Sequence, residues 1–129
     1  MAGGSARAAW GSRTLKSLGE LIQQRRKELG LTQIELAAHI RGQSGEPVSQ
    51  QRITDIESDR FGVPRRPTLT QLARALKLDI DVLYLWGRVI PPDIRAEGLP
   101  EETIKKAWAA FRAVVREGKK KSARPALTR

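Results

Sequence analysis

Apolar residues recur at helical spacing along most of the chain, and no strand-like alternation of apolar and polar residues stands out. Glycines, prolines and helix-capping residues divide this pattern into segments. We therefore predict helices over about 15–29, 33–41, 50–58, 69–77, 80–87 and 100–116. The first five are short and the last is a longer amphipathic helix, so the pattern predicts an all-α chain.

The starts of five helices are marked by side chains that can accept a hydrogen bond from a helix N terminus. These capping residues are Thr14, Thr32, Ser49, Thr68 and Asp79. Glu35 lies three residues after Thr32, which is the spacing of a capping box. Gly30 fits the left-handed position just after the first helix. Residues 42–47 contain two glycines, a serine and a proline, and are predicted to be a loop.

The chain has 24 basic and 14 acidic residues among its 129, for a net charge of +10. More than half of this charge lies in residues 1–13 and 116–129, which are rich in small and basic residues. We therefore predict a flexible basic arm over 1–13 and a basic, disordered tail over 118–129. A charge of this size favours a polyanionic partner. The tail itself is either a nucleic-acid contact or a solvated segment.

Composition argues against several other classes of protein. The chain has no cysteine and one histidine, His39, so it lacks the residues for a disulfide framework, a zinc site or histidine-based catalysis. No phosphate-binding glycine motif occurs, and no apolar run approaches the roughly 20 residues that span a bilayer. We expect a cytoplasmic binding protein rather than an enzyme, with no metal, cofactor or membrane partner.

Three segments carry a family resemblance: LGLTQIELAAHI, PVSQQRITDIESDR and PTLTQLARALKLDIDVL. Together they resemble the phage-repressor or Cro type of helix-turn-helix protein, also called the xenobiotic-response-element family, over about residues 15–86. This resemblance implies a five-helix, lambda-repressor-like domain over 14–87 whose third helix lies in the major groove of double-stranded DNA. The connection over 41–48 is longer than the usual turn between the second and third helices.

The resemblance also implies roles for individual residues. Base contacts are implied near the start of the third helix, for Ser49, Gln50, Gln51, Arg52, Thr54 and Asp55. Backbone contacts are implied for Gln33, Arg60, Arg65 and Arg66. Glutamine suits base reading because its amide can bridge the N6 and N7 atoms of adenine. Asp55 either accepts from cytosine N4, repels phosphate or caps Arg52.

Several other polar residues have either a structural interpretation or two alternative interpretations. Arg26 and Glu57 match positions that pair as a structural salt bridge between the first and third helices of the family. Arg41 and Gln43, in the long loop, either approach the DNA backbone or belong to an inert bulge. The three arginines that follow the third helix are interpreted as phosphate clamps rather than solvated side chains, because counterion release favours such contacts.

Residues 88–117 lie outside the resemblance and are interpreted as a linker followed by the amphipathic helix. The apolar stripe of this helix contains Ile104, Trp108, Phe111 and Val115. The stripe either folds back on the domain or contacts a second copy, and we favour a homodimer because reading two half-sites requires one.

The chain is therefore predicted to be a dimeric transcriptional repressor of prokaryotic or phage type, associated with the nucleoid. The alternative is an antitoxin or co-regulator whose main role is to bind a partner protein, such as a toxin or another regulator, through residues 88–117.

Overall fold

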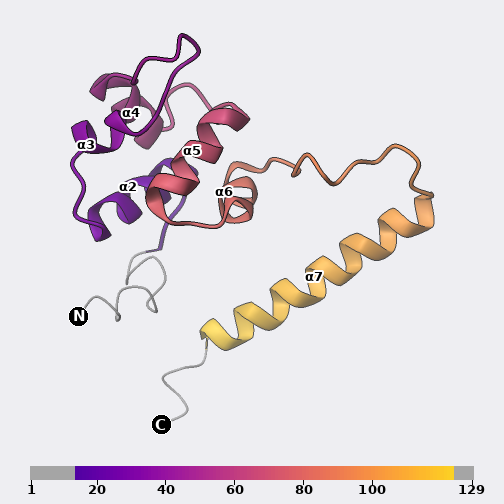
Figure 1. Ribbon diagram of the computed structural model, residues 1–129. Helices are drawn as coiled ribbons and strands as arrows, with labels where there is room; N and C mark the ends of the chain where they lie inside the picture. Colours follow the sequence, from indigo (N-terminus) through magenta and orange to yellow (C-terminus); the bar gives the residue numbers. More distant parts are fainter. Residues whose placement is uncertain (1–13, 124–129) are drawn as a thin grey trace. The chain divides into compact units, whose positions relative to one another are not determined.

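The computed structural model describes residues 14–123, which contain six α-helices and no β-strand (Figure 1). The helices are α2 (Leu18–Glu28), α3 (Gln33–Ala38), α4 (Gln50–Glu57), α5 (Arg66–Leu76), α6 (Ile80–Gly87) and α7 (Glu101–Ala123). The predicted all-α fold, with five short helices before a longer one, is confirmed. No helix within 14–123 combines the length and the apolar character needed to cross a membrane. The predicted arm over 1–13 and the tail residues 124–129 lie outside the described residues.

The chain forms two compact units, the first extending to Pro91 and the second beginning at Pro92. The first unit has a hydrophobic core to which α2–α6 all contribute. Its largest fully buried side chains are Leu21, Ile22, Leu36, Ile40, Ile53, Leu69, Leu72, Leu76 and Leu83. Helices as short as these are marginal in water by themselves, so the burial of their apolar stripes is what stabilises them.

The first helix begins later than the sequence predicts. Thr14 does not cap it; the N-cap is Ser17, whose hydroxyl oxygen accepts from the Glu20 N–H at 3.2 Å. Asp59, which follows α4, reaches the same helix start. Its carboxylate accepts from the Gly19 N–H at 2.9 Å and from the Ser17 hydroxyl at 2.5 Å. The start of α2 thus combines a local cap, Ser17 with Glu20 three residues later, with a contact from a residue 40 positions away that local spacing does not reveal.

The start of α5 also differs from the prediction. The helix begins at Arg66, and Thr68, the expected N-cap, lies within its first turn. Pro67 occupies that turn as well, where its missing N–H has no intrahelical partner to lose. The remaining predicted caps are confirmed: Thr32 with Glu35, Ser49 and Asp79.

Residues 39–48 connect α3 to α4 by a small, hydrogen-bonded turn. Because of this turn, α3 ends before the predicted boundary near residue 41. Arg41 and Pro47 form an isolated antiparallel bridge, and the Val48 N–H donates to the Ile40 carbonyl oxygen at 2.8 Å. Gly45 has a φ of 89°, a conformation that favours glycine. The backbone bonds give the long loop a defined shape.

The second unit contains α7, an amphipathic helix of 23 residues. The helix continues to Ala123 rather than ending near Arg116, so residues 118–123, which were expected to be disordered, are helical. Two glutamates in its first turn and two lysines in its last turn match the helix dipole, which favours the longer helix.

Candidate nucleic-acid interface

α3 and α4 pack against each other, and each begins with a capped first turn. Thr32 caps α3 through a complete capping box, and the Ser49 hydroxyl caps α4. Gln33 is the first residue of α3 and is half-buried, whereas Gln50 and Gln51 begin α4 and are exposed. The two helix starts therefore bring three glutamine side chains to the surface of one helix pair.

Gln33 connects the two helices by hydrogen bonds. Its Oε1 accepts from Gln50 Nε2 at 3.3 Å and from Thr54 Oγ1 at 3.2 Å. Its Nε2 donates to Glu57 Oε1 at 3.0 Å. The first turn of α3 and the exposed side of α4 thus belong to one network.

Glu57 anchors this network in the core. Its residue surface is 7% exposed, and that of Arg26 on α2 is 8% exposed. Arg26 Nε donates to Glu57 Oε2 at 2.5 Å, and Arg26 Nη2 donates to Oε1 at 3.1 Å. The ion pair predicted for these two residues is therefore present, with the bidentate geometry that suits a buried pair. Arg26 is held by the scaffold, since its Nη1 also donates to the Leu31 carbonyl oxygen at 2.8 Å.

The carboxylate of Glu57 determines which way the Gln33 amide faces. An ionised carboxylate accepts hydrogen bonds and cannot donate them, so Gln33 directs its NH₂ group to Glu57 and its oxygen to α4. Gln50 then meets that oxygen with its own NH₂ group. This orientation leaves the Gln50 Oε1 and a second N–H for another partner, which is the acceptor and donor combination that adenine requires.

Asp55 is engaged by side chains around it. Its Oδ1 accepts from Gln51 Nε2 at 3.0 Å and lies 3.8 Å from Arg60 Nη1. The Arg60 guanidinium group also lies 5.3 Å from the centre of the Phe61 ring. Asp55 therefore pairs with an arginine, but that arginine is Arg60 and not Arg52.

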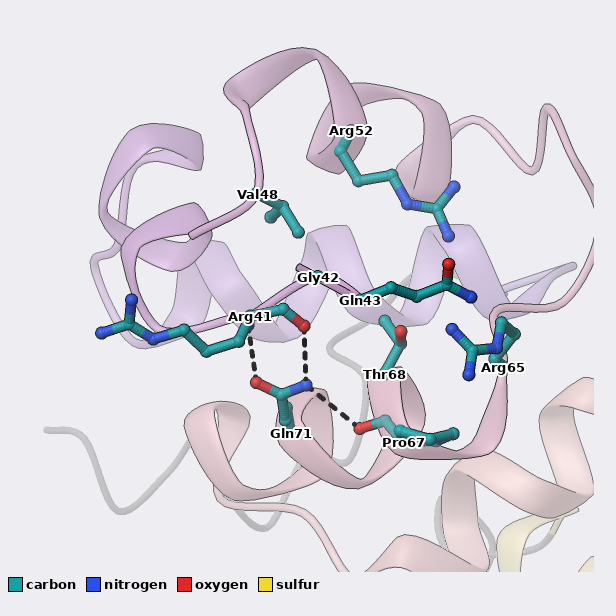
Figure 2. Close-up of a pocket in the computed structure, with 9 residues that line it drawn as sticks. All are labelled: Arg41, Gly42, Gln43, Val48, Arg52, Arg65, Pro67, Thr68 and Gln71. Carbon is teal, nitrogen blue, oxygen red and sulfur yellow. Dashed lines mark hydrogen bonds between the residues drawn. The ribbon is translucent and has the colours of Figure 1, made fainter. Parts of the chain in front are cut away.

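Arg52 lines a cavity of about 650 Å³ between the long loop, α4 and the start of α5 (Figure 2). Arg65 and Gln43 line the same cavity, and in Figure 2 their polar ends and that of Arg52 lie on the same side of it. The Arg41 guanidinium group points the other way. The structure thus brings Arg52, a predicted base contact, next to two predicted backbone contacts.

Gln71 on α5 holds the long loop against this cavity. Its Oε1 accepts from the Arg41 N–H at 2.6 Å, and its Nε2 donates to the Arg41 carbonyl oxygen at 3.0 Å (Figure 2). The same Nε2 donates to the Pro67 carbonyl oxygen at 3.3 Å. The amide of Gln71 thus pairs with both backbone groups of Arg41, as a neighbouring strand would, and fixes the position of the loop.

Known proteins match the part of the chain that carries this geometry. A family model described as a helix-turn-helix domain matches residues 17–86, more than half of the chain. The chain belongs to the phage-repressor or Cro-type helix-turn-helix family. This helix-turn-helix protein is 37% identical to the ImmF control region 10 kDa protein of Bacillus phage phi105 over 70 residues, which cover 54% of this chain and 70% of the phage protein. No solved structure matches.

As a member of this family, the helix-turn-helix protein is a DNA-binding regulator. The matched region contains α2–α6 and stops before α7. Within it, the arginines that follow α4 are all exposed: Arg60, Arg65 and Arg66. Among the residues predicted to contact bases, Gln50 and Thr54 donate to Gln33. Gln51 donates to Asp55, Ser49 caps α4, and Arg52 lines the cavity.

Sequence reasoning missed two residues that shape this helix-turn-helix domain, Asp59 and Gln71. Gly19 is a signal for the first, because a Cβ at this position would lie 2.7 Å from both the Ile56 carbonyl oxygen and Asp59 Oδ2. A glycine inside a predicted helix therefore indicates the close approach of another element. Gln71 has no such signal, since its partner is the backbone of a loop 30 positions away.

Proposed function

We propose that this protein is a sequence-specific regulator of transcription that inserts α4 into the major groove of double-stranded DNA. The observation that carries the proposal is the hydrogen bond between Gln33 and Gln50. It holds a glutamine amide at the exposed start of α4 with a donor and an acceptor left for a base edge. Gln51 and Ser49 lie in the same turn, and Gln33 lies beside it, in reach of the DNA backbone.

The proposed contacts with bases and the proposed contacts with the DNA backbone come from different parts of this surface. Base reading belongs to Ser49, Gln50, Gln51 and Thr54, on the side of α4 that carries the network. Asp55 would accept a hydrogen bond from cytosine N4 after it has released its hydrogen bond with Gln51 and its ion pair with Arg60. Backbone contacts belong to the surrounding side chains: Gln33, Arg60, Arg65 and Arg66, with Arg41 and Gln43 in the long loop.

We further propose that the protein acts as a homodimer through α7 and represses by occluding a promoter. The supporting observation is the apolar stripe formed by Ile104, Trp108, Phe111 and Val115. Trp108 and Phe111 are each 43% exposed, and their rings form an edge-to-face pair with centroids 5.7 Å apart. A second α7 related by two-fold symmetry offers a matching apolar surface. Two DNA-binding units would then read two half-sites, and the protein would reside in the cytoplasm with the nucleoid.

The second candidate is an antitoxin or co-regulator that binds a partner protein through residues 88–117. Exposed apolar side chains between α6 and α7 favour it: Ile90, Ile94 and Leu99. A stoichiometric partner that co-purifies with the chain and survives nuclease treatment would support this candidate. Purification of the chain alone, with full affinity for DNA, would count against it.

Selection of bound sequences from random double-stranded DNA tests the proposed function. We expect one consensus made of two related half-sites. The Gln50→Ala variant should bind that consensus more weakly by roughly 1–3 kcal/mol for each half-site and show a relaxed preference at one base pair of each half-site. Gln24→Ala removes the same group from α2 and serves as the matched control, so it should leave the consensus unchanged. No enriched sequence, or an unaltered consensus in Gln50→Ala, would contradict base reading by α4.

A further inference from the structure

The cavity beside α4 has the character of an anion-binding site. Arg52 and Arg65 bring guanidinium groups to it from two different elements, and Gln43 adds an amide from the long loop (Figure 2). Within the part of the chain that the structure describes, no acidic side chain lines the cavity, and neither guanidinium group has an ion-pair partner. Two adjacent cations without a counter-ion repel each other, so an anion from outside would stabilise this arrangement.

The position of Arg52 on α4 indicates where such an anion would come from. Successive residues of an α-helix are rotated by about 100°, so Gln50, Gln51 and Thr54 share one face while Arg52 lies beyond the edge of that face. Gln33 meets this face from the opposite edge. A recognition helix in the major groove has a phosphate backbone on each side, so Arg52 would face the strand opposite to the one beside α3.

The long loop builds one wall of the cavity, and it is held in place before any ligand binds. Gln71 pairs with both backbone groups of Arg41, and the Val48 N–H donates to the Ile40 carbonyl oxygen. A wall that is already ordered loses little conformational entropy when a ligand binds. The side chain of Arg41 is not part of the anion site, since its Nη1 donates to the Gly45 carbonyl oxygen at 3.4 Å and it points out of the cavity.

We propose that this cavity binds one phosphate group of the DNA strand that passes along this edge of α4. Arg52 and Arg65 donate to the same phosphate, and the Gln43 amide lies beside them. Planar guanidinium groups suit this role because their paired N–H groups match two phosphate oxygens. The proposal rests on DNA binding by α4 as proposed above, and it makes Arg52 a phosphate contact and the long loop the wall of a phosphate site.

The salt dependence of DNA binding tests this arrangement. The slope of log Kobs against log salt concentration changes by about 0.9 for each phosphate that a protein neutralises. Because both arginines serve one phosphate, the double variant Arg52→Gln, Arg65→Gln should lose about 0.9 of slope. Arginines on two separate phosphates would instead lose about 1.8. The measurement uses the full chain and a short duplex that carries a single half-site of the selected consensus, so that one DNA-binding unit is bound and both slope values refer to that unit.

Two further variants control for charge and for folding. Arg74→Gln removes the same charge from an exposed position of α5 outside the cavity, and it should leave the slope unchanged. Arg65→Lys keeps the charge without the planar fork, so it should keep the slope while lowering the affinity. Thermal unfolding of each variant shows whether the first unit is still folded at the temperature of the binding experiment.

Titration of the DNA-free protein with inorganic phosphate and with a nucleoside triphosphate tests whether the cavity binds a free phosphate compound rather than a phosphate of DNA. Saturable binding that the double variant loses, together with an unchanged slope on DNA, would assign the cavity to a free phosphate compound and overturn the proposal. A slope loss near 1.8, or an unchanged slope with no phosphate binding, would also overturn it. Failure of the unmodified chain to bind DNA would instead refute the proposed function.

Discussion

Among single residues, Glu57 connects the folded core to the surface proposed to read DNA. Its carboxylate accepts hydrogen bonds from Arg26 and Gln23 on α2 and from Gln33 on α3. A buried ion pair is tolerated when its polar atoms all have partners, and no buried side-chain nitrogen or oxygen within residues 14–123 lacks one. The same carboxylate therefore supports the packing of three helices and orients the amide that holds Gln50.

We expect the substitution Glu57→Gln to lower the free energy of unfolding by about 3–5 kcal/mol. A neutral amide leaves the Arg26 charge buried without a counter-ion, which is the costly way to break such a pair. Denaturation by urea, followed by circular dichroism, measures the loss. Glu35→Gln is the matched control, because glutamine also completes a capping box, and its effect should stay within about 0.5 kcal/mol. Similar losses of unfolding free energy in the two variants would contradict a special contribution of the buried ion pair to stability.

At the scale of elements, the start of α2 packs closely against the end of α4. Gly19 is buried there, and the carbonyl oxygens of Glu57 and Ile56 lie too close to leave room for a Cβ. Asp59 has a φ of 59°, and its carboxylate accepts from the Gly19 N–H and from the Ser17 hydroxyl at the start of α2. The residue that follows α4 therefore stabilises the start of α2.

The close packing around Gly19, compared with the open space around Gly118, predicts opposite effects of a glycine-to-alanine substitution. Gly19→Ala should destabilise the first unit by about 1–3 kcal/mol, because the added methyl group meets backbone atoms that cannot move independently. Gly118→Ala should instead stabilise α7 by about 0.5–1 kcal/mol, since nothing lies within 4 Å of an added Cβ there. Thermal unfolding and helix content by circular dichroism measure both effects. Changes of the same sign would contradict the close packing at Gly19.

Most helix caps with local signals were predictable from the sequence, whereas contacts between distant segments were not. The capping box of Thr32 and the cap of Asp79 involve residues at most three positions apart, so spacing alone predicts them. The start of α2 was misplaced although Ser17 and Glu20 give it a local signal, and its contact with Asp59, 42 positions from Ser17, has no such signal. In the candidate site, the glutamines at the start of α4 could be predicted from the sequence, whereas the cavity around Arg52 could not. Its shape depends on how the long loop is held by α5, which no local pattern encodes.

The whole molecule combines a DNA-binding unit with a separate amphipathic helix. More than half of the net charge of +10 lies in residues 1–13 and 116–129, near the two ends of the chain. Charge placed there raises the rate of encounter with DNA and the affinity for any sequence. Specificity is proposed to come from a few positioned amides, Gln33, Gln50 and Gln51, and from the homodimer.

We expect Phe111→Asp to convert the proposed dimer into a monomer, because it places a charge in the apolar stripe of α7. Ala113→Asp introduces the same residue on the other side of the helix and should leave the dimer intact. Sedimentation velocity of the full chain, alone and with operator DNA, measures the oligomeric state. A monomeric unmodified chain under both conditions, or a dimer that survives Phe111→Asp, would refute association through this stripe.

The connection between α6 and α7 has a consequence for the arrangement of operators. Residues 88–100 separate the two helices, and 13 residues can extend over at most about 45 Å. If two copies join through α7, the length of this connection limits the half-site spacings that both DNA-binding units can reach. Adding one helical turn of DNA between the half-sites, about 34 Å, would then reduce the effective concentration of the second unit without preventing its binding. Operators of such a regulator would share half-site sequences while differing in spacer length by whole turns.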